Sequence, residues 1–173
     1  MKRKLAIDSR ELIVAFEYAE GIQAYLDLET GAIVQISDDA FSDLENLPVD
    51  EDDDLETALQ NVEDWQQEIL REAIPIQEGL GARYLKIPQI DSFEDYRDMA
   101  DFIATIEDDH RRELLEVAIR GKGAFRRFKD VLYSYPDERE RWFAFQEEEM
   151  QRRVIHWLNA KNIELDESNN RSG

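Results

Sequence analysis

Residues 22–36 read IQAYLDLETGAIVQI, and this stretch decides the fold class. Residues 22–27 are extended in character, and residues 32–36 return to that character after the turn residues Glu29-Thr30-Gly31. Gly31 can take the positive φ that a tight turn requires. The stretch predicts a β-hairpin near the N-terminus, to which a short strand over residues 83–87 adds a third member.

Helical patterns surround the hairpin on both sides. Before it, Asp8-Ser9-Arg10-Glu11 has the form of a capping box and predicts a short helix that ends at Gly21. After it, apolar residues at helical spacing predict one long helix over residues 55–73 that ends before Pro75. Four further helices are predicted, beginning at Ser92, after Asp108-Asp109, at about Gly123 and near Asp137.

The predicted fold class is therefore α+β, a mostly helical single domain with a small antiparallel β-hairpin or three-stranded sheet near the N-terminus. At 173 residues and 42% hydrophobic composition, the chain can bury one sizeable core and is short for two full domains. We expect a single globular domain over residues 1–163 and a flexible tail over residues 164–173.

The formal net charge of -20 disfavours general binding to nucleic acids and anionic membranes, because both would repel the protein. The absence of cysteine excludes disulfides and thiol chemistry. No run approaches the roughly 20 apolar residues that a membrane helix needs, and no signal core follows the basic N-terminus. We expect a cytoplasmic protein with no membrane partner, and the sequence sets no oligomeric state.

Half of the net charge lies in one segment, because residues 38–56 contain ten acidic residues and no basic ones. This composition predicts a mobile, solvated loop over about residues 38–54. Asp50, Asp52 and Asp54 have the spacing of the first ligands of an EF-hand loop. Leu55 and Asn61 stand where that loop needs glycine and glutamate, so no calcium site is predicted.

A second segment departs from the overall acidity, since residues 111–129 contain seven basic and two acidic residues. Gly121-Lys122-Gly123 lies between two predicted helices, so free amides at the second helix's N-terminus could face an anion. It is not a P-loop, because no serine or threonine follows Lys122. The candidate residues for binding an anion or a partner are Arg120, Lys122, Arg126, Arg127 and Lys129.

The alternative is that these cations pair with the protein's own carboxylates, such as Glu138, Glu140 and residues 147–149. Exposed pairs of this kind contribute only about 0.2 to 1 kcal/mol each. The spacing of Phe125 and Phe128 on one helical face predicts core residues rather than platforms for stacked bases.

Nothing in the sequence assembles a catalytic constellation. Glu107 and His110 have the Glu-x-x-His spacing of di-iron bundles, but Arg153 stands where a second copy before His156 needs a glutamate. No serine occupies a nucleophile elbow. We assign no catalytic residue, metal or cofactor, and the expectation is a non-enzymatic protein.

The string GKGAFRRFKDVL at residues 121–132, followed by Tyr135-Pro136, Trp142-Phe143-Ala144-Phe145 and Trp157-Leu158, resembles a bacterial family of unknown function. That family is uncharacterised protein family zero-one-five-eight. The likeness covers roughly residues 5 to 160 and implies a small bacterial cytoplasmic protein. It implies no activity, cofactor or catalytic residue.

Three functional hypotheses follow from the sequence. The first is a non-enzymatic protein-interaction or regulatory module whose partner is a protein. The second is binding of phosphate, nucleotide or RNA through the basic segment 120–129. The third is an acidic mimic of nucleic acid that occupies a DNA-binding protein.

Overall fold

The predicted hairpin forms, and its first strand lies at the centre of a three-stranded antiparallel sheet. Strand β2 (Ile22–Asp27) pairs with β3 (Ile33–Ser37) on one side and with β4 (Tyr84–Lys86) on the other. Gly31 has a φ of +78°, as the turn requires. The predicted fold class is confirmed: the protein is α+β and mostly helical, with a small antiparallel sheet near the N-terminus.

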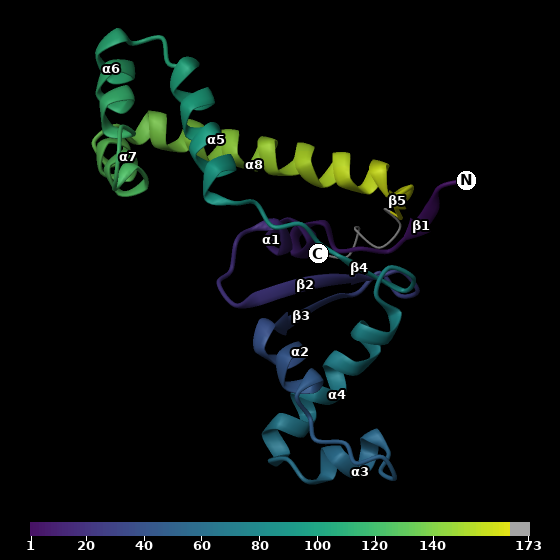
Figure 1. Cartoon of the computed structure of the whole chain (residues 1–173). Helices are drawn as coiled ribbons and strands as arrows, with labels where there is room; N and C mark the ends of the chain where they lie inside the picture. The colour runs from purple at the N-terminus through teal and green to yellow at the C-terminus, as the bar shows by residue number, and fades with distance from the viewer. Residues whose placement is uncertain (167–173) are drawn as a thin grey trace. The chain divides into compact units, whose positions relative to one another are not determined.

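The structure is a computed structural model that describes residues 1–166 (Figure 1). These residues divide into two compact units, and each is described by itself below. Unit 1 contains residues 1–89 and 161–166, and unit 2 contains Ile90–Ala160. The predicted single domain over residues 1–163 stays a prediction.

Unit 1 begins with a pairing between the two ends of the described chain. Strand β1 (Arg3–Leu5) pairs in parallel with β5 (Ile163–Leu165). The first two residues of the predicted tail at 164–173 therefore belong to a strand. No local sequence pattern predicts this strand, because it pairs with residues at the other end of the chain. The rest of that predicted tail, from residue 167, lies outside the described residues.

The predicted N-cap of the first helix is confirmed. The Asp8 carboxylate accepts hydrogen bonds from the amides of Arg10 (2.9 Å) and Glu11 (3.1 Å), and α1 spans Ser9–Phe16. The helix ends earlier than predicted, because Glu17 already has an extended backbone. Gly21 does take positive φ, at +73°, but directly before β2 rather than at the helix end.

The acidic stretch contains a helix where the sequence predicted a loop. Helix α2 (Asp38–Glu45) is capped by the Ser37 hydroxyl and begins with two aspartates, which the positive end of a helix dipole favours. Ala40 is buried, and the ring of Phe41 contacts that of Tyr25 at 5.8 Å between centroids. Local capping and packing on the sheet therefore outweigh the repulsion between the acidic side chains.

The long helix predicted over residues 55–73 is two helices. Asp54 caps a short α3 (Leu55–Gln60), the chain breaks, and α4 (Asp64–Gly79) then runs through Pro75 instead of ending before it. Pro75 is exposed, so the carbonyl that it deprives of an amide partner lies on the outer face of the helix. The buried residues of α4 are Leu70, Ala73 and Ile76.

Unit 2 is built from four helices that the sequence predicted in this order. They are α5 (Ser92–Ala104), α6 (Asp109–Ala118), α7 (Ala124–Tyr133) and α8 (Pro136–Ala160). Asp91 and Asp108 cap α5 and α6. The shared core contains Met99, Phe102, Ile103, Ile106, Leu115, Ile119, Ala124, Phe128, Leu132 and Trp142.

One buried ion pair ties the longest helix of unit 2 to the first. Asp98 on α5 is 6% exposed, and the Arg153 guanidinium on α8 donates to it at 2.6 Å. A second carboxylate, that of Glu94, lies 3.4 Å from Arg153. Because an unpaired buried carboxylate is costly, this pair favours one register of α8 along α5.

Candidate functional site

The basic segment predicted from the sequence spans the end of α6, a tight loop and α7. Gly121 and Gly123 both have positive φ, at +72° and +79°, and Gly123 is the residue directly before α7. This left-handed geometry reverses the chain between the two helices. The prediction that the glycines separate two helices is confirmed.

Arg127 uses its side chain to close the loop. Its Nε donates to the Ala118 carbonyl at 2.8 Å, and its two terminal nitrogens donate to the carbonyls of Arg120 and Lys122. Carbonyls at a helix C-terminus have no N–H partner within the helix, so the Arg127 guanidinium supplies the missing hydrogen-bond donors. Arg127 therefore has a structural task here.

The other four candidate cations are exposed, and none forms an ion pair with another residue of the described chain. Arg120 and Lys122 line a shallow hollow of about 600 Å³ between α6 and α7. Lys129 lines a different depression, and Arg126 lines neither. The structure therefore brings Arg120, Lys122 and Arg127 together and separates Lys129 from them.

Internal pairing with carboxylates holds for the arginines that precede the predicted site. Arg111 at the start of α6 donates to Asp137 at 2.8 Å and lies 3.5 Å from Glu138. The hydrogen bond from Arg111 lowers the pKa of the Asp137 carboxyl. Arg112 pairs with Asp109 on its own helix. The alternative hypothesis of internal pairing thus describes Arg111 and Arg112, and not the candidate cations.

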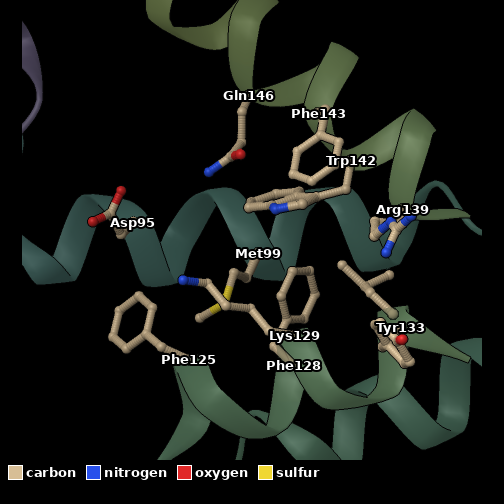
Figure 2. Close-up of a pocket in the computed structure, with 11 residues that line it drawn as sticks. Asp95, Met99, Phe125, Phe128, Lys129, Tyr133, Arg139, Trp142, Phe143 and Gln146 are labelled. Carbon is tan, nitrogen blue, oxygen red and sulfur yellow. The ribbon is translucent and has the colours of Figure 1, made fainter. Parts of the chain in front are cut away.

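A second depression, which the sequence did not predict, lies among α5, α7 and α8 (Figure 2). We call it the aromatic groove. Its volume is about 520 Å³. It is lined by Asp95, Met99, Phe125, Phe128, Lys129, Leu132, Tyr133, Arg139, Trp142, Phe143 and Gln146.

The floor of the aromatic groove consists of buried, mutually packed aromatic rings. Phe128 is 1% exposed and Trp142 is 6% exposed, and their ring centroids lie 4.9 Å apart with the planes at 76°. Phe102 packs beneath both rings, with its centroid 5.3 Å from that of Trp142 and 6.4 Å from that of Phe128. Such edge-to-face arrangements hold aromatic rings in fixed positions.

Three large side chains form the walls and remain open to solvent. Phe125 is 40% exposed, Phe143 is 57% exposed and Tyr133 is 76% exposed. The prediction that Phe125 is a core residue is therefore wrong. Phe128, at the next turn of α7, is buried as predicted, because it turns toward the floor while Phe125 turns toward the mouth.

The groove carries a charged group at each end. Lys129 extends toward Asp95 at one end, and Arg139 lies beside Tyr133 at the other (Figure 2). The pKa of the Asp95 carboxyl is raised, first by burial and then by the negative charge of Asp98. The guanidinium of Arg139 lies 5.8 Å from the ring centroid of Tyr133, and its Nε is buried with no hydrogen-bond partner among the described residues.

The sequence does contain a signal for this groove. Trp142, Phe143, Ala144 and Phe145 are consecutive, and successive side chains of a helix point about 100° apart. One helix face cannot bury them all. At least one aromatic ring of the string must therefore face solvent or a second surface, and in the structure this ring is Phe143.

Two features that residues 1–166 lack bear on function. No group of three or more histidine, aspartate or glutamate side chains is arranged to hold a metal ion there. Glu107 and His110, the pair with di-iron spacing, are both exposed. No helix of the described chain is long and apolar enough to cross a membrane.

Comparison with known proteins places the chain in a family. A family model described as an uncharacterised protein family, UPF0158, matches residues 54–170 and so spans all of unit 2. A curated UPF0158 protein from Pseudomonas aeruginosa is 26% identical over 162 residues, which is 94% of this chain and 87% of the relative. No solved structure matches. The chain belongs to the uncharacterised protein family UPF0158, as its Gly-Lys-Gly-Ala-Phe-Arg-Arg-Phe string predicted.

Proposed function

We propose that the protein is a non-enzymatic interaction module whose aromatic groove binds a short segment of a partner protein. One observation carries the proposal: Phe125, Tyr133 and Phe143 stay exposed around a buried aromatic floor. Leaving large apolar side chains in water is unfavourable, and a cluster of them rimmed by polar groups is typical of an interaction surface.

The composition of the groove supports a protein as the occupant. Aromatic residues and arginine are enriched where protein interfaces derive most of their binding energy, and the groove presents aromatic side chains together with Arg139. A small-molecule site usually encloses 70 to 90% or more of its ligand. Walls as exposed as Tyr133 and Phe143 favour one or two side chains that project from a longer segment.

The apolar surface that binding buries sets the size of the binding free energy. Fully burying one apolar side chain of the segment contributes roughly 1.5 to 3 kcal/mol, before the cost of ordering the segment. A gain of this size, together with a few polar contacts, corresponds to a weak and transient partner. The proposal is therefore a regulated or transient contact rather than a permanent assembly.

The proposal is tested by selecting binders from a random peptide library displayed on phage and measuring their affinity for purified variants. Phe143→Ser removes one wall, and Ile155→Ser is the matched control, because Phe143 and Ile155 are 57% and 56% exposed on the same helix. We expect Phe143→Ser to weaken binding by about tenfold and Ile155→Ser to change it less than about twofold. Equal effects of the two substitutions would refute the groove as the site.

A second candidate function rests on the hollow between α6 and α7. Arg120 and Lys122 line it without a carboxylate partner in the described chain, which supports the binding of a phosphate-bearing ligand such as a nucleotide or RNA. Charge reversal at Arg120, Lys122 and Arg126 should abolish binding of a labelled single-stranded RNA, and binding should weaken steeply with salt. Arg127 is left unchanged in this test, because its reversal would open the α6 end.

A further inference from the structure

Arg139 differs from the other arginines of its helix. Arg141 donates to Glu138 at 2.7 Å, Arg152 donates to Glu149 at 2.7 Å, and Arg153 donates to Asp98 at 2.6 Å. Arg139 lies between two glutamates in the sequence, yet it forms no ion pair within residues 1–166. A cation that leaves the nearest carboxylates unused while it lines a groove is available to a carboxylate from elsewhere.

The surroundings of Arg139 point to a planar acceptor. Its guanidinium lies 5.8 Å from the ring centroid of Tyr133, and its Nε is buried without a partner in the described structure. Because Arg139 forms no ion pair within residues 1–166, a carboxylate that enters the groove meets a cation whose charge no neighbouring side chain offsets. A guanidinium presents a fork of donors that matches a carboxylate with two parallel hydrogen bonds.

The opposite end of the groove has no net positive charge. There the Lys129 ammonium and the Asp95 carboxylate are within the same lining, so their charges offset each other. Gln146, which also lines the groove, is neutral. Electrostatic attraction for an acidic group of the ligand is therefore strongest at Arg139 and weakest near Asp95. This difference favours one orientation of the bound segment along the groove.

We propose that the partner segment is acidic: an apolar side chain lies between Phe125 and Phe143, and a neighbouring aspartate or glutamate pairs with Arg139. This inference rests on the proposed function, since it specifies what the groove accepts. It also reconciles the site with a chain of net charge -20, because unit 2 holds twelve basic and seventeen acidic side chains and is much closer to neutral than the whole.

The test uses three fluorescein-labelled heptapeptides with a central phenylalanine, in which the residue next to it is glutamate, glutamine or lysine. Fluorescence anisotropy of the full chain should give an affinity for the glutamate peptide about tenfold higher than for the glutamine peptide, with the lysine peptide weakest. The preference should shrink as salt is added.

Variants of the protein then assign the preference to one residue. Arg139→Gln should make the glutamate and glutamine peptides bind equally, and Arg139→Lys should keep part of the preference through charge alone. Arg126→Gln is the control, since Arg126 is exposed and lies outside the groove, and it should leave the preference unchanged. Circular dichroism of each variant verifies that the helices remain folded.

The outcomes separate the two proposals. In one outcome, the peptides bind the wild-type protein and bind the Phe143→Ser variant more weakly, but glutamate gives no advantage over glutamine. The proposal of an acidic partner is then wrong, and the proposal that the groove binds a partner segment is retained. A glutamate preference that persists in folded Arg139→Gln also overturns the assignment. If no peptide binds, or if Phe143→Ser has no effect on binding, the proposed function fails and this inference fails with it.

Discussion

The Arg127 guanidinium closes the C-terminal end of α6 through three backbone carbonyls. The sequence offers Arg126 and Arg127 as equals, because both are arginines in one basic run. Both side chains are exposed, and only their positions on α7 distinguish them: Arg127 reaches back to the preceding helix end, and Arg126 forms no side-chain hydrogen bond with the described residues. Two neighbouring arginines in one basic run thus differ in role: Arg127 has a structural task, and Arg126 has none in the described residues.

We predict that Arg127→Gln lowers the free energy of unfolding by about 1 to 2 kcal/mol, because the substitution leaves helix-end carbonyls without donors. Arg126→Gln should change it by less than about 0.5 kcal/mol, as expected for an exposed side chain outside such a network. Urea titration followed by circular dichroism measures both. Equal destabilisation by the two substitutions would contradict the closing role of Arg127.

Asp27 gives unit 1 a pH-dependent contact. Arg83 donates to both carboxylate oxygens, at 3.1 and 2.9 Å, and the Glu29 amide donates at 2.9 Å. The hydrogen bonds from Arg83 lower the Asp27 pKa to about 2, against the opposing effect of burial. Because the folded pKa lies below the unfolded value, ionised Asp27 stabilises the fold above about pH 4, and this stabilisation is lost as the pH falls toward 2.

We therefore expect the difference in unfolding free energy between the wild type and Asp27→Asn to be largest near neutral pH and to shrink between about pH 4 and pH 2. Denaturant titrations at several pH values measure it. Asp53→Asn, at an exposed residue, is the control and should alter the pH profile little. A difference that stays constant down to pH 2 would refute the role of the Asp27 charge.

At the scale of elements, short-range signals fixed where most helices begin, and tertiary contacts fixed where they end. Asp8 caps α1 as the sequence predicted, whereas α1 ends well before Gly21. Pro75 does not end α4, because it lies on an exposed face where a missing amide is tolerated. Helix ends depend on which residues meet the sheet or the core, and no local pattern contains that information.

The hairpin turn is also restricted by a contact with a segment that is distant in the sequence. A β-carbon added at Gly31 would lie 2.5 Å from the backbone oxygen of Ala6, and φ there is +78°. Gly81 has a similar φ of +83°, but a β-carbon there would have nothing within 4 Å. Both positions favour glycine through their backbone conformation, and only Gly31 is also restricted by a neighbouring segment.

Gly81→Ala should therefore cost about 1 to 2 kcal/mol of unfolding free energy, which is the strain of an L-residue at positive φ. Gly31→Ala should cost at least about 2 kcal/mol more, because the Ala6 backbone must also move. Thermal unfolding of the two variants side by side measures the gap. Similar losses in both variants would show that Ala6 does not restrict the turn.

At the scale of the whole molecule, the acidic charge is unevenly distributed. Unit 2 has a net charge of -5, and the remaining -15 belongs to the rest of the chain. The aromatic groove and the hollow between α6 and α7 both lie in unit 2. The hypothesis of an acidic nucleic-acid mimic stays a prediction, to be tested by competition with DNA for a purified DNA-binding protein. The groove and the acidic surface thus belong to different parts of the sequence.

The order of the four helices of unit 2 could be predicted from the sequence, but the aromatic groove could not. Helical spacing predicted both Phe125 and Phe128 of α7 as core residues, and only Phe128 is buried. Whether a side chain at the edge of an apolar stripe is covered depends on the rotation of three helices about their axes. That rotation is set by contacts such as Arg153 with Asp98, which join residues far apart in the chain.

The most direct test of the central claim, that the groove receives a partner protein, is site-specific photo-crosslinking in bacterial cells. p-Benzoylphenylalanine is placed at position 143 or, as the control, at position 155, which is equally exposed on the same helix. The account predicts one defined protein adduct from position 143 that disappears in combination with Phe125→Ser, with its crosslink mapped beside an acidic residue, and no such adduct from position 155. An adduct of equal yield from both positions, or one indifferent to Phe125→Ser, would contradict it.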